Sequence, residues 1–380
     1  MIKILLLIDY SSDYDRRLLR GLVRYSEEKG PWMFYRLPFY FIEMYGMEGV
    51  LSWARKWNPD AIIGKLESNT IDLQKELNVP VVLLNFHWRS TKYSNLTGDY
   101  HEEGRIAAGF FKEKFFSDYA FFGLSDVVWS EERREGFEQE VRNSGGNFYC
   151  FTTPAVDDEM RAGVARWLEE LPKPIALFCC DDERALFVSE TCKMLNIAIP
   201  NEISLLGVDN DELMCAISDP PISSIPLLVE EGGYAMAELL ERQIVGEDCT
   251  AFNLKVMPGE IIERRSTDRY NILDENILKV VRYINDKYTS SDLDTTRLLQ
   301  LVPLSRRNLE TKFKRTMGVS IYSYILERRC DRLAQLLTST RMDLADAAIE
   351  AGFSSYSNLS RIFKERKGLT PSEYRRKFSK

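Results

Sequence analysis

The stretch Asn308–Tyr324, NLETKFKRTMGVSIYSY, organises the C-terminal part of this 380-residue chain, because it recurs fifty residues later as Asn358–Tyr374, NLSRIFKERKGLTPSEY. The two copies share the pattern N-L-x-x-x-F-K-x-x-x-G-x-S/T-x-x-x-Y. Seven positions that match at one offset indicate a repeated supersecondary unit.

Each copy predicts a short helix with an exposed basic face that follows another short helix. In the second copy, Leu359 and Phe363 recur at helical spacing and would face a core, while Gly368 ends the helix. The preceding segment, residues 343–353, is rich in alanine, and Gly352 supplies its turn. Two short helices joined by a glycine turn, the second of them basic, are typical of a helix-turn-helix.

The pattern places the two helix-turn-helix units at about residues 292–318 and 342–368, with one long helix over residues 320–338 between them. Asp343 and Ser355 are the expected N-caps of the second unit, because both residue types accept hydrogen bonds from free backbone N–H groups.

This region resembles the AraC-type DNA-binding domain. The resemblance rests on Gly352-Phe353-Ser354, on Phe363-Lys364, and on Gly368 with the run Thr370-Pro371-Ser372-Glu373-Tyr374-Arg375 that follows it. The first unit departs from that family at Leu299 and Pro303, where alanine and a small turn residue are usual. The resemblance implies that the second helix of each unit enters the major groove of double-stranded operator DNA.

Arginine and asparagine on these helices suit the guanine and adenine edges of the major groove. The side chains expected to contact DNA are Arg306, Arg307, Asn308 and Lys312 in the first unit and Ser355, Tyr356, Ser357, Asn358 and Arg361 in the second. Lys314, Lys364 and Lys367 are expected to contact phosphates. The two asparagines have an alternative role, which is to cap or brace their unit through local backbone hydrogen bonds.

Charge is distributed unevenly along the chain. The net charge of −8 combines +8 over residues 271–380, which hold 21 basic and 13 acidic residues, with −16 over residues 1–270. A basic segment attached to an acidic body predicts a polyanion-binding module joined to a domain with another task. A merely solvated basic surface would explain the charge but not the repeated motif.

Composition argues against several other classes of protein. No run of about 18 apolar residues is present, so no membrane span is expected, and the apolar segment Met1–Asp9 suits a buried strand better than a signal peptide. The seven cysteines lack C-x-x-C spacing and there are two histidines, so we expect no metal site and no cofactor. Scattered cysteines indicate reduced thiols and a cytoplasmic location.

Strand and helix patterns alternate from the N-terminus to about residue 265, which predicts parallel sheets with right-handed crossovers. The fold class is therefore α/β, with a two-lobed parallel-sheet domain over residues 1–268 and an all-α domain over residues 269–380, joined at Glu263–Asp268. Strands are expected at 2–8, 33–37, 60–64, 80–86, 119–123, 148–151, 175–180 and 203–208. Helices are expected at 15–29, 48–57, 71–77, 102–116, 131–143, 159–170, 182–195, 229–245 and 274–287.

Ligands of such sheets bind beyond the carboxyl ends of the strands. The loops that follow the expected strands are polar and aromatic, and none contains G-x-G-x-x-G or a P-loop. Dinucleotides and nucleoside triphosphates therefore lack their usual phosphate cradle.

The order of these loops resembles the sugar-binding core that LacI-type repressors share with periplasmic binding proteins. The resemblance is carried by Tyr14-Asp15 before Leu18-Leu19-Arg20-Gly21, by Arg133 before Gly136-Phe137, by Asp181-Asp182 before Ala185-Leu186, and by Gly207-Val208-Asp209-Asn210. It implies a sugar effector that contacts Tyr14, Asp15, Arg133, Asp181, Asp182, Asp209 and Asn210. Carboxylates accept hydrogen bonds from vicinal hydroxyls, arginine donates in a fork, and Trp129 would cover the apolar face of the ring.

Several of these side chains have a purely structural alternative. Asp182 suits the N-cap of the helix that it precedes, Arg133 a surface ion pair, and Trp129 plain packing. Asp209 stands apart, because a carboxylate directly after the buried strand 203–208 needs a partner.

A LacI-like sugar core followed by an AraC-type tail resembles the bacterial xylose operon regulators. This implies a homodimeric, sugar-responsive transcription regulator that is not an enzyme, with D-xylose as effector and RNA polymerase as partner in activation. The alternative is a carbohydrate-active or nucleotide-sugar enzyme with a helical appendage, in which Asp15, Asp182 and Asp209 act as acids and bases. A third possibility is a DNA-binding protein whose front domain only dimerises.

Overall fold

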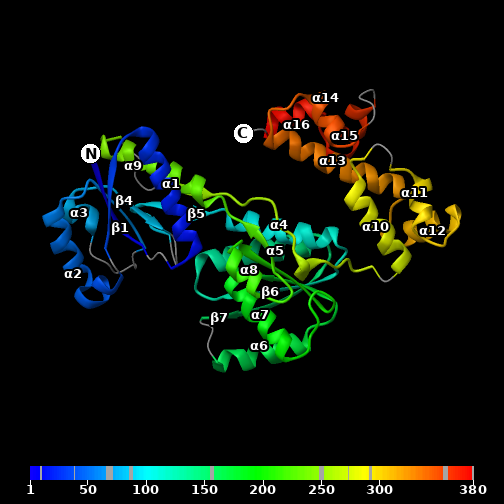
Figure 1. Ribbon diagram of the computed structural model, residues 1–380, viewed down its shortest axis with the longest axis horizontal. Coiled ribbons are helices and arrows are strands. Elements are labelled where there is room, and N and C mark those ends of the chain that lie inside the picture. The colour runs from blue at the N-terminus through cyan, green and yellow to red at the C-terminus, as the bar shows by residue number, and fades with distance from the viewer. Residues whose placement is uncertain are drawn as a thin grey trace. The chain divides into compact units, whose positions relative to one another are not determined.

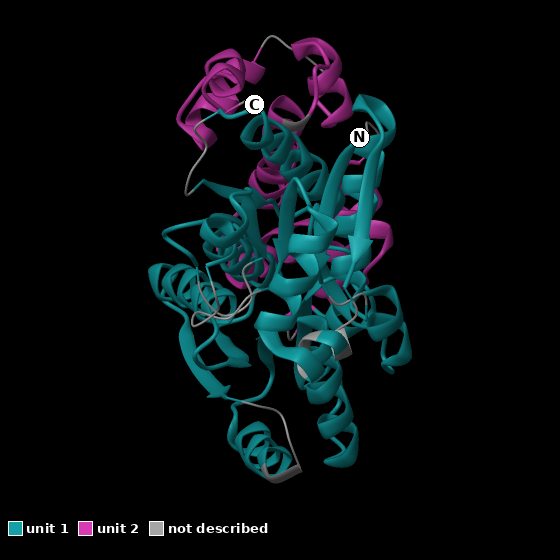
Figure 2. Cartoon of the chain, turned by 90° about the vertical axis from the view of Figure 1, so that its left-hand side faces the viewer, with its two compact units in different colours: residues 1–269 teal, residues 270–380 magenta. Residues whose placement is uncertain are grey.

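The chain forms two compact units, Met1–Arg269 and Tyr270–Lys380, which Figure 2 colours separately. The computed structural model describes residues 1–8, 11–37, 39–65, 72–84, 89–154, 158–247, 252–272, 274–290, 293–353 and 358–378. Among these residues, no helix combines the length and the apolar composition that crossing a membrane requires.

The first unit alternates strands and helices along the chain (Figure 1). Its strands are β1 (Ile2–Leu7), β2 (Trp32–Arg36), β3 (Ala61–Gly64), β4 (Val81–Leu84), β5 (Ser94–Gly98), β6 (Asp118–Leu124), β7 (Asn147–Thr153), β8 (Ile175–Cys179), β9 (Ile203–Asp209), β10 (Ser223–Pro226) and β11 (Asn253–Val256). Its α-helices are α1 (Asp13–Lys29), α2 (Phe39–Trp57), α3 (Leu73–Leu77), α4 (Tyr100–Glu113), α5 (Val128–Asn143), α6 (Asp158–Glu170), α7 (Asp182–Met194), α8 (Glu212–Ile217) and α9 (Val229–Ile244).

The strands form two parallel sheets, which confirms the two-lobed α/β prediction. One sheet has the order β11-β5-β4-β3-β1-β2 and the other β10-β9-β8-β6-β7. In β1, Ile4 and Leu6 pack in one hydrophobic core with α1 and α9, whereas Leu5 and Leu7 pack in a second core with α2 and α3. Cover on both faces explains why this strand is a continuous apolar run.

Strands β5, β10 and β11 and helix α8 were not expected from the sequence. β5 reads SNLTG and is buried along its whole length, although most of its side chains are polar. Its Asn95 side chain donates to the Ser90 carbonyl oxygen at 2.7 Å and to Oδ1 of Asn253, the first residue of β11, at 2.8 Å. Burial here depends on satisfied hydrogen bonds, which no hydrophobic pattern reveals.

Two helix pairs of the first unit approach closely through glycine. A Cβ on Gly21 of α1 would lie 2.0 Å from the carbonyl oxygen of Glu230 in α9. A Cβ on Gly104 of α4 would lie 2.2 Å from the carbonyl oxygen of Arg133 in α5, and one on Gly136 of α5 would lie 2.2 Å from that of His101 in α4. These glycines set the depth at which α4 and α5 pack, and therefore the position of Arg133.

The second unit is all helical. It contains α10 (Glu275–Lys287), α11 (Thr295–Gln300), α12 (Arg306–Met317), α13 (Ile321–Ser339), α14 (Leu344–Glu350), α15 (Leu359–Lys367) and α16 (Pro371–Phe378). Helix α16 was not expected. Helix α15 is described from Leu359, and Asn358 before it makes no side-chain capping bond. Ser355, the expected N-cap, lies outside the described residues.

The sequence repeat is also a repeat of structure. Gly318 and Gly368 end α12 and α15 with φ of 72° and 78°, in the left-handed region that favours glycine. Phe313 packs edge-on against Tyr324 with ring centroids 5.8 Å apart, and Phe363 packs in the same way against Tyr374 at 5.4 Å. Three of the seven repeated positions therefore end a helix or lock it to the next one.

We predict that Gly104→Ala destabilises the first unit by about 1–3 kcal/mol, because the added methyl group collides with the backbone of α5. Gly109→Ala is the matched control, because it lies in the same helix with no heavy atom within 4 Å of a built Cβ. It should be neutral, or stabilise by up to about 1 kcal/mol through helix propensity. Urea unfolding monitored by circular dichroism measures both, and equal midpoints would contradict the close-packing account.

Candidate functional site

A cavity of about 290 Å³ lies between the two sheets of the first unit. Its lining residues are Ser12, Tyr14, Lys65, Leu84, Gly98, Tyr100, Leu124, Trp129, Arg133, Asp181, Glu183, Arg184, Asp209, Leu227 and Val256. Many of these residues end a strand or directly follow one, in β3, β4, β5, β6, β9, β10 and β11. The cavity thus occupies the place where ligands bind to open parallel sheets.

Arg133 forms one wall of this cavity and is only 3% exposed. Its Nε donates to Glu103 of α4, and its Nη1 donates to the carbonyl oxygen of Cys180 at 2.6 Å. Its guanidinium group lies 5.1 Å from the ring centroid of Trp129 and 5.3 Å from that of Tyr100. Two aromatic faces and a buried carboxylate therefore hold the arginine, which is not the surface ion-pair member that its alternative role required.

Two carboxylates surround the Arg133 guanidinium. Glu103 is 0% exposed, and burial raises the pKa of its carboxyl group although Arg133 opposes that shift. Asp209 Oδ1 lies 4.0 Å from Arg133 Nη2, and burial likewise raises the pKa of Asp209. Burial lowers the pKa of Arg133, yet Glu103 and Asp209 outweigh it and raise the pKa above its ordinary value.

Asp181 and Asp182 have different environments. Asp181 is the N-cap of α7: it accepts the backbone N–H of Arg184 at 2.8 Å, and burial raises its pKa to about 6. Asp182 is the first residue of the helix, so its alternative role as N-cap was wrong. Its Oδ1 accepts from Ser224 Oγ at 2.6 Å and its Oδ2 from the backbone N–H of Asp211 at 2.8 Å, which ties α7 to β10 and to the loop after β9.

The structure brings together five of the eight effector residues expected from the sequence. Tyr14, Trp129, Arg133, Asp181 and Asp209 line the cavity. Asp15, Asp182 and Asn210 are not among the described lining residues, and they contact Lys65, Ser224 and Arg264 respectively.

Sequence reasoning missed Lys65, Tyr100, Glu183 and Arg184. Lys65 directly follows β3. It could have been found from the sequence, because ligands of parallel sheets bind beyond the carboxyl ends of the strands. Tyr100 is the first residue of α4, a helix whose start was expected two residues later. A small error at a helix end thus concealed an aromatic wall of the cavity.

The cations of the cavity already have acidic partners. Lys65 Nζ lies 2.7 Å from Asp15 Oδ2, Arg133 pairs with Glu103, and Arg184 Nη1 lies 3.0 Å from Asp181 Oδ2. Asp209 and Glu183 add further negative charge. A lining of this kind offers donors and acceptors to a neutral polyol, whereas an anionic ligand would have to displace existing partners.

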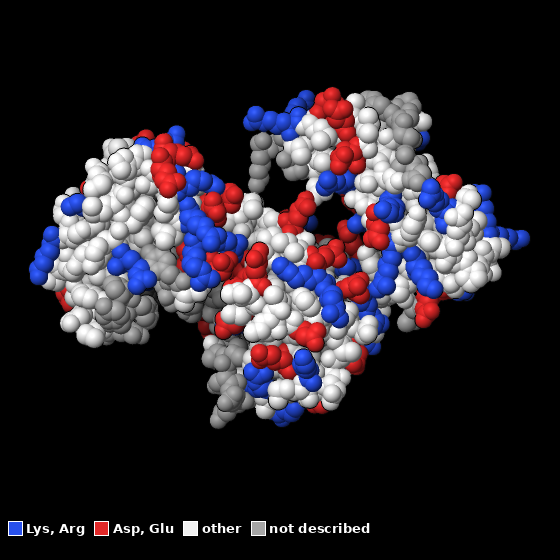
Figure 3. Space-filling view, viewed as in Figure 1, with Lys and Arg blue, Asp and Glu red and all other residues white. Residues whose placement is uncertain are grey.

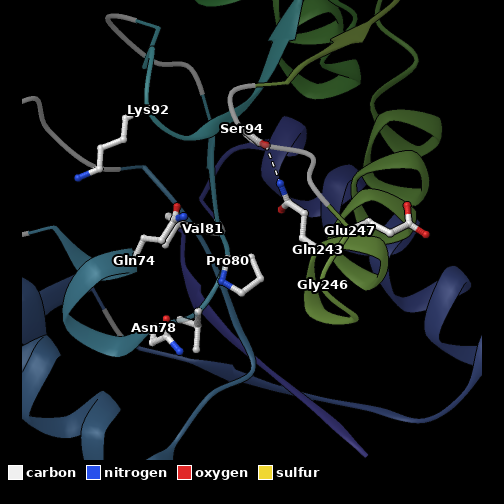
Figure 4. Close-up of a pocket in the computed structure, with 10 residues that line it drawn as sticks. Gln74, Asn78, Pro80, Val81, Lys92, Ser94, Gln243, Gly246 and Glu247 are labelled. Atoms are coloured by element: carbon white, nitrogen blue, oxygen red, sulfur yellow. Dashed lines mark hydrogen bonds between the residues drawn. The ribbon is translucent and has the colours of Figure 1, made fainter.

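A second cavity, of about 240 Å³, lies at the amino ends of β4 and β5, where Gln243 donates from Nε2 to Ser94 Oγ at 2.9 Å (Figure 4). Its described lining contains no aromatic side chain, and Lys92 and Glu247 are its charged residues. The described part of this second cavity therefore offers no aromatic face to the ring of a sugar. The described residues contain no group of three or more His, Cys, Asp or Glu side chains that could hold a metal ion.

The second unit presents basic helices. In Figure 3, lysine and arginine side chains project from the surface around α11 and α12. Of the expected DNA contacts, Arg306, Arg307 and Asn308 on α12 are exposed, as are Asn358 and Arg361 at α15. Tyr356 and Ser357, like Ser355, lie outside the described residues.

Two expected DNA-contacting lysines are engaged within the unit. Lys312 Nζ lies 2.8 Å from Asp274 Oδ2, at the N-cap of α10. Lys367 Nζ lies 3.1 Å from Glu327 Oε1 and also pairs with Asp331, both on α13. These lysines brace helices, whereas Lys314 and Lys364 are exposed.

Known proteins share both parts of this arrangement. Residues 108–267 match the model of the periplasmic binding protein-like domain, and residues 298–377 match that of a helix-turn-helix domain. The xylose operon regulatory protein of Escherichia coli K12 is 26% identical over 98% of this chain and 96% of its own length. The arabinose operon regulatory protein of the same organism is 32% identical over 27% of this chain and 35% of its own length.

The chain is a transcription regulator that joins a periplasmic-binding-protein-like domain to a helix-turn-helix domain of the AraC type. A solved structure of a xylose-binding transcription activator resembles this regulator with a TM-score of 0.61 and 25% identity, over 100% of this chain and 98% of that one. The likeness spans both units, so the regulator is a sugar-responsive DNA-binding protein. The predictions of family, fold class and general function are confirmed.

We predict that Arg133→Met destabilises the first unit of the regulator by about 3–5 kcal/mol, because it leaves Glu103 buried without its partner. Glu103 becomes neutral by binding a proton, so the loss should shrink as the pH falls. The control is Arg134→Met, whose partners Glu131 and Glu138 are partly exposed and which should cost about 0–1 kcal/mol. Urea unfolding at two pH values measures both, and equal losses would count against the buried pair.

Proposed function

We propose that this regulator is a homodimeric, xylose-dependent activator of catabolic genes that acts in the cytoplasm, where it contacts operator DNA and RNA polymerase. D-xylose is proposed as the effector of the cavity between the two sheets. The proposal draws on the likeness to xylose operon regulatory proteins and on the chemistry of the cavity lining.

One observation carries the proposal: the cavity places an arginine between two aromatic faces, beside carboxylates that lie on its wall. Trp129 and Tyr100 flank Arg133, while Asp181 and Asp209 face the same space. A pentose presents hydroxyl groups that donate to carboxylates and accept from guanidinium, and its C–H face packs against an aromatic ring. At about 290 Å³ the cavity is at the small end of ligand sites, as a monosaccharide requires.

We further propose Tyr14, Trp129, Arg133, Asp181 and Asp209 as direct contacts of the sugar, with Lys65 and Arg184 added from the lining. Asp15 and Asp182 would not contact the sugar but would hold groups near it. Asp15 holds Lys65, and Asp182 holds Ser224 and the loop after β9.

On the DNA side, we propose that α12 and α15 are the recognition helices. Arg306 and Arg361 each pair with a glutamate four residues later, and both pairs are exposed. Exposed pairs of this kind contribute little free energy, so both arginines are available to base edges. Lys314 and Lys364 are proposed to contact phosphates.

The sugar acts only through a difference in its affinity for the DNA-competent and DNA-incompetent states of the regulator. Closure of the two lobes on the sugar is the proposed source of that difference. The proposal includes no chemical step, so D-xylose should be recovered unchanged.

The test uses the full chain and a duplex that it selects from a random-sequence library. We expect calorimetry to show D-xylose binding, with a 5-phosphorylated pentose at least about tenfold weaker, because the cavity cations already have acidic partners and the lining carboxylates repel a dianion. D-xylose should then raise the affinity for the selected duplex by at least about fivefold. Equal DNA affinity with and without every pentose offered would refute the proposal, and so would turnover of the sugar.

We also predict that Arg361→Ala weakens binding to the selected duplex by about 1–3 kcal/mol, with relaxed base preference at one position. Its matched control is Lys279→Ala, which removes an exposed cation from α10 of the same unit. Fluorescence anisotropy against the selected duplex and its single-base variants measures both. A loss that is the same for all sequences would reassign Arg361 to the phosphates.

A further inference from the structure

Strand β9 ends in an unusual backbone turn. Asp209 and Asn210 both have positive φ, 98° and 52°, although neither is glycine. Residues with a side chain adopt this region at a cost, and two in succession are held there only by their surroundings. The contacts of this dipeptide show what holds it.

Asp209 connects the turn to the cavity and to the other lobe. Its carboxylate lines the cavity, 4.0 Å from the Arg133 guanidinium. Its carbonyl oxygen accepts from Arg17 Nη2 at 2.7 Å, and the Nη1 of the same arginine donates to the Leu227 carbonyl oxygen at 3.2 Å. Arg17 belongs to α1, which packs against the first sheet. Asp209 therefore responds both to a ligand, through its carboxylate, and to a movement between the lobes, through its bond to Arg17.

Asn210 connects the turn to the segment that leaves the first unit. Its Oδ1 accepts from Arg264 Nη2 at 2.7 Å, and its backbone N–H donates to Ser224 Oγ at 3.0 Å. Arg264 also donates from Nη1 to the carbonyl oxygen of Ile222 at 2.8 Å. The side-chain bond between Asn210 and Arg264 is thus a direct link from the cavity turn to the exit segment, which we define as residues 262–268.

The exit segment is held to the second sheet by further hydrogen bonds. Ser266 Oγ donates to the Leu205 carbonyl oxygen at 2.6 Å, and the Ser223 backbone N–H donates to Ser266 Oγ at 2.8 Å. The backbone N–H of Arg264 donates to Ser223 Oγ at 2.7 Å. The second unit begins at Tyr270, immediately after this segment and Arg269. The exit segment is therefore anchored to the second sheet within a few residues of the start of the DNA-binding unit.

We propose that Asn210 and Arg264 are positioning residues that transmit the occupancy of the effector cavity to the exit segment and so to the DNA-binding unit. The inference rests on the proposed sugar-responsive function. A sugar hydroxyl bonded to the Asp209 carboxylate fixes the backbone of the turn. The turn then fixes the position of the Asn210 side-chain oxygen, and the Arg264 guanidinium that bonds to this oxygen is fixed with it. Neither Asn210 nor Arg264 lines the cavity, so their loss should spare sugar binding and remove its consequence.

The test compares two affinities in the full chain. In Asn210→Gly, which removes the acceptor without straining the turn, D-xylose should bind within about threefold of the wild-type affinity. The effect of D-xylose on affinity for the selected duplex should fall below about twofold. Arg264→Met should behave in the same way, and the double variant should be no worse than either, because both changes break one link. Asn210→Asp keeps an acceptor for Arg264 and should retain the response.

Arg269→Met is the matched control, because it removes an arginine just beyond the exit segment whose Nη1 contacts the Asn201 carbonyl oxygen rather than the turn. It should keep the full response. In the wild-type chain, D-xylose should also slow amide hydrogen exchange in residues 262–268, a measurement that does not depend on any variant folding.

The outcomes separate this inference from the proposed function. If D-xylose leaves wild-type DNA affinity unchanged, the proposed function fails. If the wild type responds and Asn210→Gly or Arg264→Met responds equally, the inference is overturned. Loss of sugar binding in those variants overturns it as well, because the pair would then belong to the binding site. The inference is also overturned if D-xylose raises the DNA affinity of the wild-type chain but leaves amide hydrogen exchange in residues 262–268 unchanged.

Discussion

The buried ion pair between Arg133 and Glu103 is the interaction on which the first unit depends. Both side chains are almost fully enclosed, so removing either one leaves the other buried without its closest partner of opposite charge. Helix α4 supplies the Glu103 carboxylate and α5 the Arg133 guanidinium group. Gly104 and Gly136 bring the two helices close enough for this ion pair to form. The same arginine then faces the cavity between Trp129 and Tyr100. Packing that stabilises the lobe thus also orients a polar group for a ligand.

The second unit stabilises its short helices by repeating one packing arrangement. Two short helices cannot bury enough apolar surface by themselves, and here α12 and α15 are each locked to the next helix by a phenylalanine–tyrosine pair and a left-handed glycine. The long helix α13 carries residues of the core of the second repeat, including Leu333 and Leu337. Ion pairs within the unit, such as that of Lys367 on α15 with Glu327 on α13, connect its helices. The exposed Arg306 and Arg361, which pair with glutamates on their own helices, are the proposed DNA contacts.

Much of this organisation was readable from the sequence where burial is apolar and periodic. The continuous run of β1 and the repeat from Asn308 onward predicted a doubly covered strand and two helix-turn-helix units, because both signals report a buried face. β5 was missed since SNLTG is buried by hydrogen bonds of Asn95 rather than by apolar contact. Asp182 was misjudged for a related reason, because a carboxylate after a strand suits a cap, a ligand or a brace equally. Only three-dimensional contacts separate those roles.

The path of the chain between the lobes has a consequence for how this protein is made. The sheet that starts with β1 is completed by β11, and α1 packs against α9, so its first lobe is built from segments more than 150 residues apart. A ribosome adding about 5–20 residues per second exposes the apolar side of α1 for many seconds before α9 emerges. The intervening lobe, whose segments are closer in sequence, can fold during that delay. The helical unit is synthesised after both lobes, so a nascent chain acquires its DNA-binding unit after its first unit.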